Sequence, residues 1–269
     1  MSRTLTEAQV AQAAADLLQA ETTRAQIGLL SQRHPGMTLE DAYAIQSAQM
    51  VHKHAAGRKI VGWKIGLTSK VMQQALNIET PDSGVLYDDM VFPTGGTVPA
   101  KRFIQPRVEA EIAFVMKAPL DGDVSRADVL AATDYVAPSL EILDTRILRK
   151  DPNTGKARII VDTVSDNAAN AGVVLGAARH APEAFDLRWA GAILRVNGEV
   201  EATGLGAAVL DDPVMGLVWL ARRMQQYGQR IEAGQIILSG SFIAPIECPS
   251  GTRIEADFGP FGDVSIKFE

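Results

Sequence analysis

The sequence contains few residues of the kinds that build disulfide frameworks, zinc sites or aromatic stacking surfaces. Its 269 residues include one cysteine, Cys248, four histidines and 6% aromatic residues. A single cysteine excludes an internal disulfide framework and is usual in a reducing compartment. Apart from His52 and His54, which would face different sides of a helix, the histidines show no ligand-like spacing. A zinc site is therefore not expected.

Long apolar runs and a basic surplus are also absent. No stretch of about 18 apolar residues exists to cross a bilayer, and the first residues have no apolar core of the signal-peptide type. The net charge of −6 and the pI near 5.3 argue against nucleic-acid binding. No repeat, Walker-type loop or G-x-G-x-x-G motif occurs. We expect a cytoplasmic, enzyme-sized globular protein without a membrane or nucleic-acid partner.

Periodicity predicts an α+β fold. Residues 1–58 form an N-terminal helical segment in which Thr6 caps one helix and Thr38, followed by Asp41, caps another. The segment His34-Pro35-Gly36 separates these two helices. Irregular strand spacing argues against a regular βαβ sheet, so we expect these helices to pack on a mixed, mainly antiparallel β-roll formed by residues 59–269. The predicted strands are 60–67, 103–116, 136–143, 173–175 and 236–239, the predicted helices are 127–134 and 213–227, and the predicted hairpins join 192–196 to 200–203 and 253–258 to 263–268.

Three glutamates stand in apolar surroundings. Glu109 and Glu111 are separated by one residue in a strand pattern, so their side chains share a face roughly 6–7 Å apart. The alternative for this pair is the solvated acidic face of an amphipathic strand. Glu141 also lies among apolar residues, where an unpaired carboxylate is costly to bury. Three carboxylates suit magnesium, manganese or calcium, and the residues alone leave that choice open.

Four other polar positions are candidates for a site. Lys64 lies in a strand of apolar residues and glycines. It either binds a substrate carboxylate or carries a proton, or it is a sheet-edge lysine that faces water. Asp82 is most simply a turn residue. Asp166 and Asn167 form either a polar turn or a helix cap. The turn at 239–241 either offers donors to an anion or ends a strand.

Six segments spread over nearly the whole chain resemble the hydratase/decarboxylase group of the fumarylacetoacetate hydrolase superfamily. They are GWKIGLTS (62–69), PDSG (81–84), PRVEAEIAFV (106–115), APSLEILDTR (137–146), DTVSDNAANAGVVLG (162–176) and EAGQIILSGSF (232–242). The resemblance implies the fumarylacetoacetate-hydrolase-like fold. It also implies an enzyme that acts on 2-hydroxy-2,4-dienoates, or their 2-oxo tautomers, in the meta-cleavage catabolism of aromatic compounds.

The resemblance also implies roles for individual residues. Glu109, Glu111 and Glu141 would be the metal ligands, with magnesium as the usual ion and manganese as an alternative. Lys64 would lie in the substrate pocket, and nearby Asp82 is our candidate proton shuttle. A homo-oligomer of dimers, such as a decamer, and a complex with a pathway decarboxylase are further expectations. The candidate substrate-binding residues are Thr68, Arg146, Asn167 and Ser241.

The resemblance through residues 144–163 implies hydration of 2-oxohept-4-ene-1,7-dioate to the 4-hydroxy-2-oxo acid, as in homoprotocatechuate degradation. The preference for hydration depends on the segment 145–161, which the related decarboxylases lack in this form. Its basic residues favour this seven-carbon diacid, because a guanidinium could pair with the distal carboxylate; otherwise the segment is solvated surface. These residues are Arg146, Arg149, Lys150, Lys156 and Arg158.

Other functions remain alternatives at this point. Decarboxylation of 2-oxo-3-hexenedioate (4-oxalocrotonate) and hydration of 2-oxopent-4-enoate would use the same metal chemistry. A non-catalytic partner subunit is an alternative of a different class, although it would not need Lys64 and the three glutamates. Acylpyruvate hydrolysis uses a histidine with a glutamate, and none of the four histidines lies in a matching motif.

Overall fold

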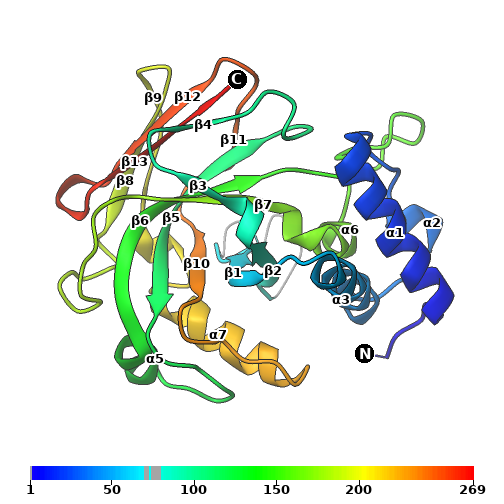
Figure 1. Ribbon diagram of the computed structural model, residues 1–269, viewed down its shortest axis with the longest axis horizontal. Coiled ribbons are helices and arrows are strands. Elements are labelled where there is room, and N and C mark those ends of the chain that lie inside the picture. Colours follow the sequence, from blue (N-terminus) through cyan, green and yellow to red (C-terminus); the bar gives the residue numbers. More distant parts are fainter. Residues whose placement is uncertain (1, 70–72, 74–79) are drawn as a thin grey trace.

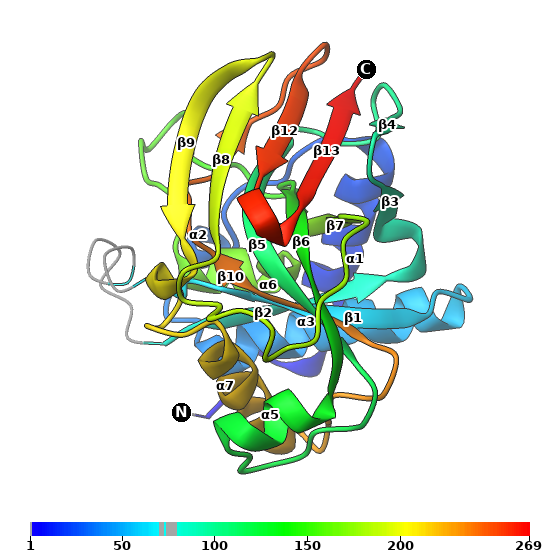
Figure 2. The same cartoon turned by 90° about the vertical axis from the view of Figure 1, so that its left-hand side faces the viewer.

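The computed structural model describes residues 2–69, 73 and 80–269, and every structural statement below refers to them. Three helices at the start of the chain lie beside two β-sheets (Figure 1). Figure 2 shows the smaller sheet in front of the long strands of the larger one, with two later helices at the opposite end. None of the described helices is long and apolar enough to cross a membrane.

The N-terminal helices begin at the predicted caps. Helix α1 (Glu7–Thr23) starts after Thr6, and α3 (Leu39–Ala55) starts after Thr38, each with a reciprocal capping box. The short helix α2 (Leu30–Arg33) ends at His34, where the sequence predicts a break. Apolar residues of these helices share a cluster with Ile147 and with α6 (Ile160–Ser165), so the N-terminal layer packs on later parts of the chain.

The larger sheet contains the long central strands. It has the order β2-β1-β10-β5-β6-β7-β3, and β11 also pairs with β5. Pairs β1–β10 and β3–β7 are parallel, whereas the others are antiparallel. The strands are β1 (Ile60–Gly66), β2 (Asp82–Tyr87), β3 (Val91–Pro93), β5 (Arg107–Met116), β6 (Thr133–Leu143), β7 (Asn170–Leu175), β10 (Ile236–Ser241) and β11 (Ile246–Glu247).

The smaller sheet has the order β4-β13-β12-β8-β9. It includes both predicted hairpins, and the first turns through Asn197 and Gly198, which both have positive φ. The strands are β4 (Gly96–Val98), β8 (Gly191–Val196), β9 (Glu199–Leu205), β12 (Arg253–Asp257) and β13 (Asp263–Phe268). The remaining elements are α5 (Arg126–Ala132), α7 (Val214–Gln225) and the 3-10 turns η1 (Asp88–Met90), η2 (Asn167–Ala169), η3 (Gly206–Ala208) and η4 (Gly259–Phe261).

The predicted fold class, N-terminal helices on a mixed and mainly antiparallel β-structure, is confirmed. The division into domains at residue 58 stays a prediction. Three local expectations were wrong. Asp82 is the first residue of β2 rather than a turn residue. Thr133 and Asp134 belong to β6 rather than to a helix. The segment 145–161 contains buried residues and the start of α6, so it is not only solvated surface.

Candidate active site

The three glutamates converge on one face of the larger sheet. Strands β5 and β6 pair so that Glu109 lies opposite Glu141, and Glu111 lies opposite Ser139. Because directly paired residues of adjacent strands share a face, Glu141 joins the two glutamates of β5 on one side. One carboxylate oxygen from each of the three lies within 4.8 Å of the others. Glu111 and Glu141 are fully buried, whereas Glu109 is partly exposed.

Several of these buried carboxylate oxygens have no hydrogen-bond donor. Gly240 N donates to Glu111 Oε2 at 2.9 Å, but Glu111 Oε1 and both Glu141 oxygens have no hydrogen-bond partner. Burial raises the pKa of Glu109 to about 7, that of Glu111 to about 8, and that of Glu141 well above its ordinary value. Buried carboxylates need a compensating partner, and a hard divalent cation fits this all-oxygen donor set.

Lys64 and Asp82 lie beside this cluster. Strand β1 is interior, between β2 and β10, so the sheet-edge interpretation of Lys64 was wrong. Its Nζ lies 3.6 Å from Glu141 Oε1 and 3.8 Å from Asp82 Oδ1, and all three side chains are buried. Burial opposes the ammonium charge, yet the carboxylates, Glu141 first, raise the pKa of Lys64 above its ordinary value. Burial also raises the pKa of Asp82, against the opposing effect of Lys64.

Glycines allow these side chains to approach one another. A Cβ at Gly66 would lie 2.3 Å from Asp82 Oδ1 and 2.7 Å from Lys64 Nζ. At Gly240, where φ is +116°, a Cβ would lie 2.3 Å from Thr68 Oγ1. Gly240 belongs to the turn at 239–241, which was predicted as a candidate for anion binding, whereas Gly66 was not predicted as a site residue. The sequence does contain a signal for Gly66, because a glycine inside an apolar strand often marks a close approach of chain segments.

The side chains of three predicted substrate-binding residues already have partners within the chain. Thr68 is buried against Gly240. Ser241 lies opposite Glu111, and its hydroxyl donates to Ile243 O at 2.8 Å. The Asn167 amide pairs with both backbone groups of Val85, at 2.8 and 3.0 Å. Thr68 and Ser241 thus adjoin the glutamate cluster through Gly240 and Glu111, and the roles of all three in substrate binding stay predictions.

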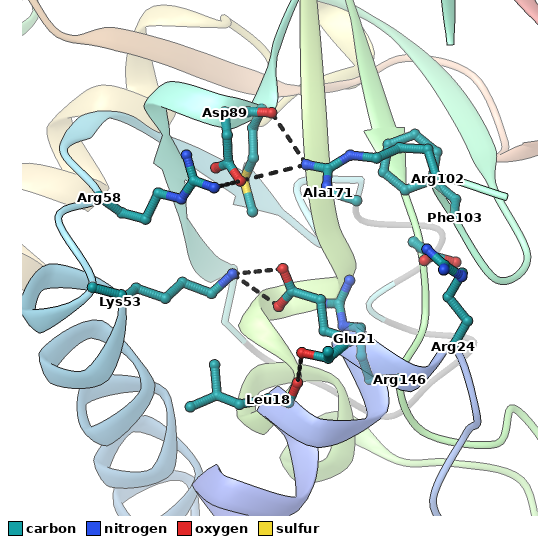
Figure 3. Close-up of a pocket in the computed structure, with 14 residues that line it drawn as sticks. Leu18, Glu21, Arg24, Lys53, Arg58, Asp89, Arg102, Phe103, Arg146 and Ala171 are labelled. Atoms are coloured by element: carbon teal, nitrogen blue, oxygen red, sulfur yellow. Dashed lines mark hydrogen bonds and ion pairs between the residues drawn. The ribbon is translucent and has the colours of Figure 1, made fainter. Parts of the chain in front are cut away.

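Arg146 lies in a different setting. It is buried, donates to the Asp166 carboxylate and lines a cavity of about 320 Å³ beside the C-terminal ends of α1 and α3 (Figure 3). The glutamate cluster does not line this cavity. Within it, Lys53 pairs with Glu21, and Asp89 pairs with two arginines. The predicted substrate contact of Arg146 is therefore not brought together with Lys64 and Asp82, and it stays a prediction.

Comparisons with known proteins place the chain among enzymes of 2-oxo acid metabolism. No family model matches it. It is 47% identical over 251 residues to 2-oxo-hept-4-ene-1,7-dioate hydratase from Escherichia coli, which covers 93% of this chain and 94% of that protein. The solved structure of 4-oxalocrotonate decarboxylase from Pseudomonas putida G7, complexed with magnesium and adipate, matches with a TM-score of 0.93 and 37% identity, and covers all of both chains.

A more distant structure shares the fold alone. Fumarylpyruvate hydrolase from Pseudomonas aeruginosa, in complex with Mn²⁺ and pyruvate, matches with a TM-score of 0.56 and 15% identity over 77% of this chain and 88% of that one. The family expected from the sequence is thus confirmed. The chain belongs to the family of these 2-oxo acid hydratases and decarboxylases, and its fold is that of fumarylacetoacetate hydrolases.

Proposed function

We propose that the protein hydrates 2-oxohept-4-ene-1,7-dioate to the 4-hydroxy-2-oxo acid in the catabolism of homoprotocatechuate. The observation that carries this proposal is the convergence of Glu109, Glu111 and Glu141 beside the buried Lys64 and Asp82. The hydratase that is 47% identical over nearly the whole chain supports the choice of substrate and reaction.

Magnesium is the proposed ion, with manganese as the alternative, and the three glutamates would hold it. The donor set is oxygen only, and a solved relative of high structural similarity is complexed with magnesium. When bound, a divalent ion supplies a Lewis acid that polarises the 2-oxo group of the substrate.

Lys64 and Asp82 have complementary roles in this proposal. The Lys64 ammonium, whose charge is favoured by its neighbours, holds the carboxylate or 2-oxo oxygen of the substrate. In the 2-hydroxy-2,4-dienoate tautomer of the substrate, Asp82 moves the proton of the 2-hydroxyl group to carbon 5, which gives a 2-oxo-3-ene with an electrophilic carbon 4. Water then adds its hydroxyl group to carbon 4, and carbon 3 takes up the proton. Burial raises the pKa of Asp82 toward the range in which a carboxyl group both accepts and donates protons. Thr68 and Ser241, which adjoin the cluster, are proposed substrate contacts.

Decarboxylation of 4-oxalocrotonate is the second candidate. It is favoured by the similarity over all of both chains to a decarboxylase that is complexed with adipate, another dicarboxylate. Both reactions begin from a dicarboxylate with a 2-oxo group, so the glutamate cluster and Lys64 serve either one. We propose, in addition, a cytoplasmic homo-oligomer built from dimers that associates with a pathway decarboxylase.

The test compares the two reactions in one preparation. Protein stripped of metal by chelation is mixed with each substrate, before and after addition of Mg²⁺ or Mn²⁺. We expect no turnover without metal, and with metal the gain of one water by 2-oxohept-4-ene-1,7-dioate without release of carbon dioxide. Activity that ignores exhaustive chelation contradicts the metal site, and rapid release of carbon dioxide from 4-oxalocrotonate contradicts hydration as the main reaction.

A further inference from the structure

The segment between β6 and α6 contains several basic residues, and they differ in their partners. Arg146 pairs with buried Asp166. Arg149 donates to Glu247 and to Gln105 O, both at 2.8 Å. Lys150 and Lys156 are exposed. Arg146 and Arg149 each have a carboxylate partner, although Arg149 shares Glu247 with Arg107 and its Nε has no hydrogen-bond partner. The charges of the two exposed lysines are solvated.

Arg158 differs from its neighbours because no carboxylate lies within ion-pair distance of it among the residues that the structure describes. It is half-buried, and its guanidinium makes a single hydrogen bond in the described chain, to Thr145 Oγ1 at 2.9 Å. Burial lowers the pKa of Arg158, but a guanidinium stays protonated at neutral pH. The half-buried Arg158 guanidinium therefore lacks a carboxylate partner, just as the buried oxygens of Glu111 and Glu141 lack a hydrogen-bond donor.

The position of Arg158 relates it to the active site. Burial raises the pKa of Asp82, and Lys64 first and Arg158 after it oppose this rise. Among the carboxylates that favour the charge of Arg158, Asp166 acts first and Asp82 second. The like charges of Arg146 and Arg107 oppose the protonation of Arg158, and Arg107 is two residues from Glu109 on the same face of β5. Thr145, which binds Arg158, follows the end of β6 by two residues, and Glu141 precedes that end by two. Its hydrogen bond to Thr145 thus places Arg158 next to the chain just beyond the end of β6, the strand that carries Glu141.

Arg223 is the rival to Arg158, because its charge also opposes the rise in the pKa of Asp82 and it has no ion pair in the described part of the chain. Its guanidinium is already stacked, however, with its central carbon 3.5 Å from the Tyr43 ring centre and 4.5 Å from that of Tyr227. These rings partly satisfy its charge. Arg158 has only a hydroxyl group as a partner, so its charge remains the less compensated of the two.

We propose that Arg158 binds the distal carboxylate of the substrate and thereby selects seven-carbon diacids over 2-oxo acids that lack this group. The inference rests on the proposed function, because it assumes that the 2-oxo acid end lies at the glutamate cluster and Lys64. A planar guanidinium can bind a carboxylate through two parallel hydrogen bonds while its third nitrogen stays with Thr145. The substrate would then be held at both ends.

Binding of two saturated analogues tests this assignment without turnover. Calorimetry with the Mg²⁺-loaded protein measures the affinity for 2-oxoheptanedioate and for 2-oxoheptanoate, which differ only in the distal carboxylate. We expect wild type to bind the diacid about ten- to a hundredfold more tightly, the effect of a charged hydrogen-bonded pair. Arg158→Gln removes this preference and leaves the affinity for 2-oxoheptanoate unchanged. Lys156→Gln, an exposed cation of the same segment, keeps the preference.

Other outcomes overturn the proposal in distinguishable ways. An Arg158→Gln variant that keeps the diacid preference, or that weakens both analogues equally, contradicts the role of Arg158. Loss of the preference in Arg223→Gln but not in Arg158→Gln assigns it to Arg223 instead. If Arg158→Gln does not fold, Arg158→Lys serves, with a reduced preference expected and an unchanged one contradictory. Equal affinity of wild type for both analogues rejects this inference alone, whereas no metal-dependent binding of either rejects the proposed function.

Discussion

The molecule contains two clusters of charged side chains, and they differ in how their charges are matched. In the glutamate cluster, buried oxygens of Glu111 and Glu141 lack a hydrogen-bond donor. In the cavity of Figure 3, by contrast, Glu21 binds Lys53, and the lining residue Arg146 binds Asp166. In the glutamate cluster one cation, Lys64, faces both Glu141 and Asp82, so the buried carboxylates are only partly compensated, whereas Asp166 and Glu21 each have a cation of their own. Buried charges without a partner in the chain indicate a ligand site, whereas buried charges that form an ion pair within the chain indicate a structural role.

The largest effect should come from removing one carboxylate of the glutamate cluster. Glu111→Gln is expected to lower Mg²⁺ affinity and turnover by on the order of a hundredfold or more, because one of three charged oxygen donors is lost. The metal-free variant should unfold no more easily than wild type, since the change relieves repulsion between carboxylates. Calorimetric titration with Mg²⁺, steady-state rates and urea unfolding measure these three quantities. Full metal affinity and turnover in this variant would end the ligand assignment.

Breaking the matched pair should affect stability instead. Asp166→Ala leaves the buried Arg146 guanidinium without its carboxylate and should lower the free energy of unfolding by about 3–5 kcal/mol. Metal affinity per folded molecule should be unchanged, because Asp166 contributes nothing to the glutamate cluster. Urea unfolding and Mg²⁺ titration of the folded fraction check both parts. A selective loss of metal or substrate binding with full stability would show that this pair belongs to the active site.

Asp41 is a buried carboxylate whose charge is stabilised by hydrogen bonds, and its contribution to the free energy of unfolding should depend on pH in a defined direction. Burial alone would raise its pKa, but hydrogen bonds from Leu5, Thr38 and Thr4 lower the pKa of Asp41 below its ordinary value. A lowered pKa in the folded state means that the stabilisation is complete above the unfolded value of about 3.9 and is lost as the pH falls toward the folded value.

Asp41→Asn should therefore lower the free energy of unfolding by about 1.5–3 kcal/mol at pH 7, as for other hydrogen bonds to a charged group. The difference from wild type should shrink as the pH is lowered below about 4. Urea unfolding of both proteins at several pH values measures it. A difference that grows toward acidic pH would contradict the direction of the pKa shift.

The smallest effect is expected for the half-exposed ion pair near the cavity. Lys53→Met removes the partner of Glu21, whose side chain is 37% exposed, and solvent can replace the lost interaction. The free energy of unfolding should change by about 0–1 kcal/mol, and less at high salt. Thermal unfolding at two salt concentrations is the measurement. A loss as large as that of Asp166→Ala would show that exposure does not separate the matched pairs as proposed.

Local features of this protein follow from neighbouring residues and were predictable. The caps at Thr6 and Thr38, and the hairpin turn at Asn197 and Gly198, each depend on a few consecutive side chains. The shared face of Glu109 and Glu111 follows from the two-residue period of a strand. Strand β2 was missed, because the Pro81 and Gly84 that flank Asp82 and Ser83 are typical of turns.

The sequence by itself determined the fold class, the helix starts, the apolar faces and the residue types available for chemistry, because these depend on composition and on spacing of a few residues. Only the tertiary structure decided which distant groups meet. The pairing of β5 with β6 brings Glu141 to Glu109, and the position of β1 between β2 and β10 brings Lys64 to Asp82. It also decided which arginine of the basic segment lacks an anion, since Asp166 and Glu247 come from other parts of the chain. Such partners are set by strand order and packing, which no local pattern encodes.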